Sequence, residues 1–121
     1  VRAMTMLPGR GLREGDDRHV KGFILNKLYL GGYFARRGRH GKHTSVDNLP
    51  KGYPLKHRGK FPEITDELRR EGFVIVLPSG GEKHVCAVLD SEKIEEGLRL
   101  CNAYRGAVGL PPLDERFREI F

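Results

Sequence analysis

A helix that ends in glycine and leads straight into a β-hairpin is the feature that most constrains how this chain folds. Two β-rich runs, FVIVL at 73–77 and HVCAVL at 84–89, flank the turn PSGGEK. Apolar, β-branched runs around a short glycine-containing connection favour an antiparallel hairpin. Gly72, just before the first run, supplies the left-handed residue that ends many helices. We therefore expect a helix and a hairpin joined without a linker.

Three segments have the periodicity of amphipathic helices, with apolar residues at steps of three and four. Each also has a start signal, either a capping side chain or a proline at the first helical position. Gly31 and Gly32 weaken the end of the first helix. The expected helices are residues 18–34 capped by Asp16 or Asp17, residues 62–71 opened by Pro62, and residues 92–104 capped by Ser91.

Residues 35–60 are dense in glycine, proline and positive charge and cannot hold a long helix. Val46, Leu49 and Tyr53 are nevertheless spaced by three and four residues. This spacing predicts one short helical turn around Ser45–Leu49, with Thr44 or Ser45 as its cap.

The chain of 121 residues suits one domain with short extensions. We expect an α+β fold over residues 18–104, a flexible N-terminal arm over 1–17, and a tail over 105–121 with a short helix from Asp114. The expected core is Phe23, Ile24, Leu28, Ile64, Leu68, Val74, Val76, Val85, Val88 and Leu98.

The positive charge is concentrated in one part of the chain. The net charge is +6, and residues 21–60 carry ten lysines and arginines against Asp47 alone, whereas the rest of the chain is slightly acidic. A localised positive field is what a surface that binds a polyanion requires. The charge pattern therefore favours nucleic acid as the partner.

The order helix, short turn, helix, hairpin, helix resembles the winged helix-turn-helix domains that bind DNA, with a three-helix core, a β-hairpin wing and a C-terminal helix. The segments HTSVDNLPKGYP, ELRREGFVIV and GEKHVCAVLD are similar to small uncharacterised archaeal winged-helix proteins. The resemblance implies that residues 62–71 lie in the major groove and that the wing tip, residues 79–83, contacts the DNA backbone or the minor groove.

The outer face of the expected groove helix departs from this pattern, because it presents Glu63, Asp66 and Arg70 with Glu67 beside them. Carboxylates repel phosphates, so we expect backbone contacts of low sequence specificity, made mainly by the basic loop. Phosphates would sit at the free N–H groups that open the Pro62 helix, beside Lys60. The expected binding residues are Arg36, Arg37, Arg39, Lys42, Lys51, Lys56, Arg58, Lys60, Arg70 and Lys83.

Other chemistries have weaker support in the sequence. His40, His43, His57 and His84 lie among lysines and arginines, which oppose a bound cation, so no metal is expected. The segment GRHGKHT resembles a phosphate loop, but the spacing of its second glycine is wrong. No nucleophile and base, carboxylate pair or dinucleotide fingerprint is recognised. We expect neither an enzyme nor a cofactor.

The sequence also allows expectations about cellular location, heat adaptation and oligomeric state. No apolar run is long enough for a membrane span or a secretory signal, and the two cysteines form no zinc or disulfide pattern, so a cytoplasmic protein is expected. The lack of glutamine and scarcity of asparagine hint at a thermophile. Apolar residues in the tail predict a homodimer. The alternatives to DNA binding are an RNA-binding or ribosome-associated module and a protein-interaction adaptor.

Overall fold

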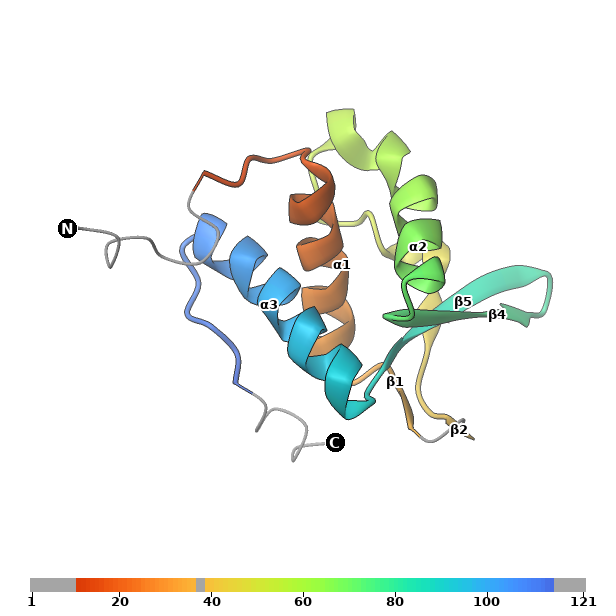
Figure 1. Cartoon of the computed structure of the whole chain (residues 1–121). Coiled ribbons are helices and arrows are strands. Elements are labelled where there is room, and N and C mark those ends of the chain that lie inside the picture. The colour runs from red at the N-terminus through yellow and green to blue at the C-terminus, as the bar shows by residue number, and fades with distance from the viewer. Residues whose placement is uncertain (1–10, 37–38, 115–121) are drawn as a thin grey trace.

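Helix α1 lies between α2 and α3, and a hairpin of two strands projects from the side that carries α2 (Figure 1). The computed structural model describes residues 11–36 and 39–114. It is an α+β fold of three α-helices and a small mixed sheet. The elements are α1 (Asp17–Gly31), β1 (Phe34–Arg36), β2 (Arg39–His40), β3 (Thr44–Ser45), the 3-10 helices η2 (Val46–Asn48) and η3 (Leu55–Lys60), α2 (Phe61–Arg70), β4 (Val74–Ser79), β5 (Glu82–Val88) and α3 (Ser91–Ala107).

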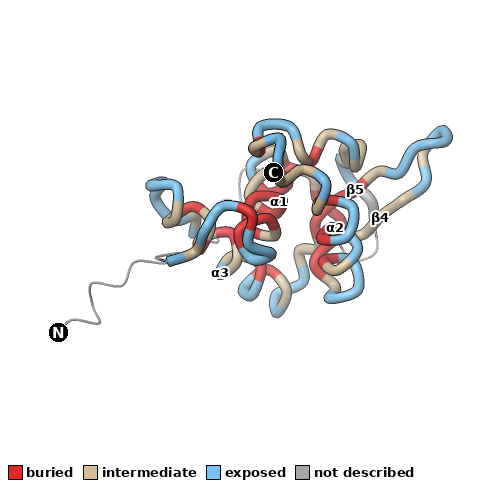
Figure 2. The backbone as a smooth tube through the Cα atoms, turned by 90° about the horizontal axis from the view of Figure 1, so that it is seen from above, coloured by how far each residue is buried: buried red, intermediate tan, exposed pale blue. Residues whose placement is uncertain are grey.

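The core follows α1, which is buried along most of its length because helices cover it on both sides (Figure 2). Of the expected core residues, Val76 and Leu98 are only partly buried, and Val88 lies outside the core cluster. Side chains alternate across a strand, so Val85 and Ala87 face the core and Val88 faces away. The other seven expected core residues are buried as predicted.

The first two α-helices end next to glycines in the left-handed conformation. Helix α1 stops at Gly31, because Gly32 adopts a left-handed φ of 72° and its N–H bonds to the carbonyls of Leu28 and Tyr29. The expected extension to Phe34 is therefore wrong, and Phe34 opens β1 instead. Proline in the first turn of α2 and a left-handed Gly72 after it confirm the second helix.

The sheet is built around β5. Strand β4 pairs antiparallel along one edge of β5, from Val74 opposite Ala87 to Ser79 opposite Glu82. The other edge is shared by β1, which runs parallel to β5, and β3, which runs antiparallel to it. Strand β2 pairs with β1. None of the three short strands was predicted: β1 begins at the expected end of the first helix, β2 lies in the expected basic loop, and β3 lies at the expected cap of the short helical turn.

The hairpin turn is shorter than expected. Gly80 and Gly81 alone connect the strands, with φ of 57° and 87°. Two consecutive left-handed residues are what a tight two-residue hairpin turn requires, and glycine supplies them without strain. The turn at Val46–Asn48 is confirmed, and the Ser45 hydroxyl accepts a hydrogen bond from the Asp47 N–H.

The described part of the tail folds back on the last helix. Helix α3 begins at Ser91, one residue earlier than expected, with Asp90 at its N-cap, and continues to Ala107. The Asn102 side chain bonds both the N–H and the carbonyl of Leu113, and Arg105 Nε donates to the Pro111 carbonyl at 2.6 Å. The guanidinium of Arg105 also donates to Asn26 Oδ1 on α1. The last helix therefore continues three residues beyond its expected end at Tyr104. The residues that would form the short helix expected from Asp114 lie, from residue 115 on, outside the described part of the chain.

Helices α1 and α3 approach so closely that a glycine is needed at the contact. A Cβ at Gly22 would lie 2.5 Å from the Leu100 carbonyl oxygen and from Tyr104 Cβ. Because the first of these atoms belongs to the α3 backbone, it cannot rotate away. The whole α1–α3 contact would have to open to admit a methyl group.

We predict that Gly22→Ala destabilises the protein. Alanine favours a helix by about 1 kcal/mol over glycine, whereas overpacking a core costs about 1–3 kcal/mol. Since the blocked atom is backbone, we expect a net loss of about 1–2 kcal/mol in the free energy of unfolding, measured by denaturant titration. Gly59→Ala is the matched control, because its Cβ would meet nothing within 4 Å. Equal midpoints for the two variants would show that the contact tolerates a methyl group.

Candidate nucleic-acid interface

The structure divides the ten expected binding residues into groups with different partners. Arg37 lies outside the described residues, and only the backbone is described for Arg36 and Arg39, which pair with each other between β1 and β2. Two of the remaining residues, Lys60 and Arg70, are bound to carboxylates. The rest form no ion pair with any described residue: Lys42, Lys51, Lys56, Arg58 and Lys83.

Lys60 holds the start of α1 rather than the start of α2. Its Nζ lies 2.9 Å from Asp17 Oδ1 and donates to the Gly15 carbonyl at 2.6 Å. The hydrogen bond to Asp17 raises the pKa of Lys60. The 3-10 helix η3 also runs into α2 without a break, and the Phe61 N–H already donates to the Arg58 carbonyl. The phosphate site expected at the start of this helix is therefore not formed.

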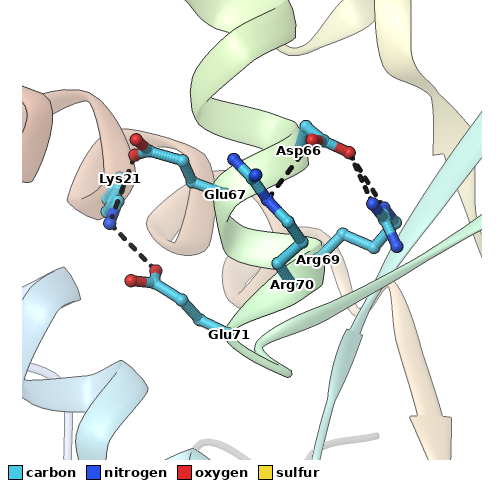
Figure 3. A network of polar contacts seen from close by, with 6 residues as sticks. All are labelled: Lys21, Asp66, Glu67, Arg69, Arg70 and Glu71. Atoms are coloured by element: carbon cyan, nitrogen blue, oxygen red, sulfur yellow. Dashed lines mark hydrogen bonds and ion pairs between the residues drawn. The ribbon is translucent and has the colours of Figure 1, made fainter.

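The outer side of α2 is nearly balanced in charge (Figure 3). Asp66 accepts from Arg69 at 2.8 Å and pairs with Arg70 at 3.4 Å, and the hydrogen bond from Arg69 lowers the pKa of its carboxyl group. Lys21 reaches across from α1 to Glu67 and Glu71. The expected groove helix thus presents cations that are already paired with its own carboxylates.

Three of the five expected binding residues without a carboxylate partner lie on one loop, which we call the cationic loop (residues 49–58). Lys51 Nζ donates to Asn48 Oδ1, and Arg58 Nε donates to the Tyr53 carbonyl at 2.7 Å. Lys56 is exposed. The hydrogen bonds of Lys51 and Arg58 are both made to neutral groups. They orient the two side chains and leave their positive charges uncompensated.

A lysine that the sequence analysis did not single out builds this loop. Lys27 Nζ, on α1, donates to the carbonyls of Asn48, Leu49 and Lys51, at 2.9, 3.1 and 2.5 Å. It also lies over the Phe23 ring, 5.0 Å from the centroid. The signal in the sequence was its position four residues after Phe23, on the apolar side of a helix that otherwise buries hydrophobic residues. A lysine there needs buried acceptors.

The electrostatics of Lys27 reflect the positive charge of the loop side chains near it. Burial lowers its pKa most, and the charges of Lys51 and Arg58 lower it further. None of the causes that act on this pKa comes from a described carboxylate. On the side of the loop that faces Lys27, the charges of Lys51 and Arg58 therefore add to that of Lys27, whereas Glu14 lies near His57.

A buried histidine attaches the other end of the loop. The Tyr53 hydroxyl accepts from the Gly15 N–H at 2.8 Å and lies 2.7 Å from His19 Nδ1. Desolvation by burial lowers the pKa of His19, and the nearby Glu14 and Asp16 only partly oppose this effect. A neutral imidazole can accept a hydrogen bond from the hydroxyl through Nδ1, whereas a protonated one can only donate its Nδ1–H to the hydroxyl oxygen. Burial favours the neutral form of His19.

The expected histidines do not form one cluster. His43 and His84 approach with their Nδ1 atoms 2.8 Å apart, and His84 Nε2 lies 3.3 Å from Glu82, so this pair links β3 to the base of the hairpin. His57 is elsewhere, 3.8 Å from Glu14. Among the residues that the structure describes, no group of three or more His, Cys, Asp or Glu could hold a metal ion.

Comparisons of the chain with protein-family models, with curated proteins and with solved structures give no match. None of the described helices is both long and apolar enough to cross a membrane. The resemblance to winged-helix domains and the homodimer therefore remain predictions. Of the apolar tail residues behind the dimer prediction, Leu113 packs against its own core, and Phe117, Ile120 and Phe121 lie outside the described residues.

We predict that Lys27→Met destabilises the protein by about 1.5–3 kcal/mol, because hydrogen bonds to a charged group are lost and three carbonyls lose their donor. Denaturant unfolding measures the change, and amide hydrogen exchange of residues 48–53 should rise with it. Lys51→Met is the control, since its side chain is exposed and should change stability by no more than about 0.5 kcal/mol. Equal stability for both variants would mean that Lys27 does not hold the loop.

We also predict that stability falls as the pH drops below about 6.5, the ordinary pKa of histidine. The unfolded chain takes up a proton on His19 in this range, whereas the folded chain keeps the imidazole neutral to lower pH. The unfolded state then binds more protons and is favoured by acid. Denaturant midpoints at pH 7 and pH 5 should differ less for His19→Gln than for the unaltered protein. Parallel pH profiles would contradict the assignment.

Proposed function

We propose that this protein binds duplex DNA through its sugar-phosphate backbone, with the cationic loop as the main contact surface. The observation that carries the proposal is that Lys51, Lys56 and Arg58 stand together on an anchored loop with no described carboxylate to pair with. Such cations release condensed counterions when they replace them at phosphates. The gain is independent of base sequence, so low specificity is expected.

We further propose that the fold is a winged helix. The order of α1, the short helical segments, α2, the β4–β5 hairpin and α3 supports this proposal. In winged-helix domains the helix before the hairpin reads the major groove. Here that helix, α2, has its arginines paired with Asp66. Contacts by the cationic loop would then contribute more to affinity than contacts by α2.

A salt titration of duplex DNA binding tests the proposal. The Lys51→Ala/Lys56→Ala double variant should bind more weakly, and its log-log salt slope should be shallower by about 1.8 if both residues contact phosphates. Both side chains are exposed, so the fold should be unaffected. The control is Lys93→Ala/Arg99→Ala, which removes the same charge from α3, on the other side of α1 (Figure 1).

Equal slopes for the two double variants and the unaltered protein would show that the cationic loop is not the binding surface. Structured and single-stranded RNA titrated in parallel decide between the nucleic acids. A ten-fold preference for RNA, about 1.4 kcal/mol, would replace the DNA proposal with the RNA-binding alternative. Absence of binding to every nucleic acid would favour the adaptor alternative.

A further inference from the structure

A leucine projects from the middle of the cationic loop. Leu55 opens η3 and is 78% exposed, whereas the other exposed large hydrophobic residues of the described chain reach at most 52%, at Leu30. Single exposed leucines are common on protein surfaces. What distinguishes Leu55 is that the loop around it is firmly held and its charged neighbours lack carboxylate partners.

The loop is anchored on both sides of Leu55. Before it, Lys27 bonds three carbonyls, and Tyr53 is buried against the rings of Phe23 and Phe61. After it, the His57 N–H donates to the Pro54 carbonyl at 3.0 Å. Arg58 bonds back to the Tyr53 carbonyl. These contacts hold the backbone on both sides of Leu55, and its side chain is exposed.

The surroundings of Leu55 match the chemistry of a DNA groove. Lys51 precedes Leu55 in the loop, and Lys56 and Arg58 follow it, and none of the three forms an ion pair with a described residue. A DNA groove has the complementary arrangement, with rows of phosphates at its edges and flat apolar base faces between base steps. Proteins that bend DNA insert leucine or proline side chains between base steps in this way.

We propose that Leu55, with Pro54 beside it, enters the minor groove of duplex DNA and partly unstacks one base step, while Lys51, Lys56 and Arg58 contact the flanking phosphates. This inference rests on the proposed function. Unstacking and bending raise the energy of the DNA, and the added phosphate contacts offset that rise. Flexible steps such as TA would be favoured, since they unstack most easily.

The test uses duplexes with donor and acceptor dyes at their ends and 2-aminopurine at a central TA step. The unaltered protein should bend the duplex by about 20–90° and raise the 2-aminopurine fluorescence. Leu55→Ala should abolish both signals while still binding, and Leu55→Met, which keeps an apolar wedge, should retain them. Leu30→Ala is the control, since Leu30 is an exposed leucine at the end of α1.

Four results would overturn the inference. Binding without bending or unstacking, or bending that persists in Leu55→Ala, would reject the wedge and leave the proposed function standing. Absence of duplex binding by the unaltered protein would reject both. A change of sedimentation coefficient in Leu55→Ala without DNA would instead assign Leu55 to contact between copies of the chain.

Discussion

The contact between one lysine of the central helix and three backbone carbonyls fixes the loop that we propose as the nucleic-acid contact surface. Lys27 projects from α1 toward the segment between η2 and η3 and bonds the carbonyls of residues 48, 49 and 51. This segment has little regular secondary structure, so few of its own groups can bond these carbonyls. A charged side chain supplies the donors instead. The path of the chain into η3 and α2 follows from this contact.

The parts of the fold that local sequence determines were predictable. Periodicity located the three helices, Gly72 and Pro62 set the limits of α2, and the Gly-Gly turn located the hairpin. The strands β1, β2 and β3 were missed because each has only two or three residues. Such short strands are defined by pairing along β5 and leave almost no period of their own. Tertiary contacts, which a local sequence pattern does not reveal, determine where these three strands form.

The candidate surface shows a similar limit. Counting charges along the chain located the basic stretch, but it could not show which cations have carboxylate partners. Lys21 and Lys60 belong to the stretch by sequence, and both are bound to acidic residues from other segments. Lys51, Lys56 and Arg58 are not. Ion pairs also change the interpretation of α2. Its acidic residues are offset by Lys21, Arg69 and Arg70, so they do not form a uniformly negative face.

The polar contacts of Arg105 connect the described part of the tail to α1 and α3. Its buried guanidinium is shared between Asn26 on α1 and the Pro111 carbonyl, and Asn102 holds Leu113 through both backbone groups. A chain cut after Tyr104 would lose this arginine and with it the link from α3 to Asn26. A chain cut after Gly109 would keep the buried cation with one acceptor fewer, which is an unfavourable state. The autonomous unit therefore includes Leu113, and fusion partners or affinity tags belong beyond that residue.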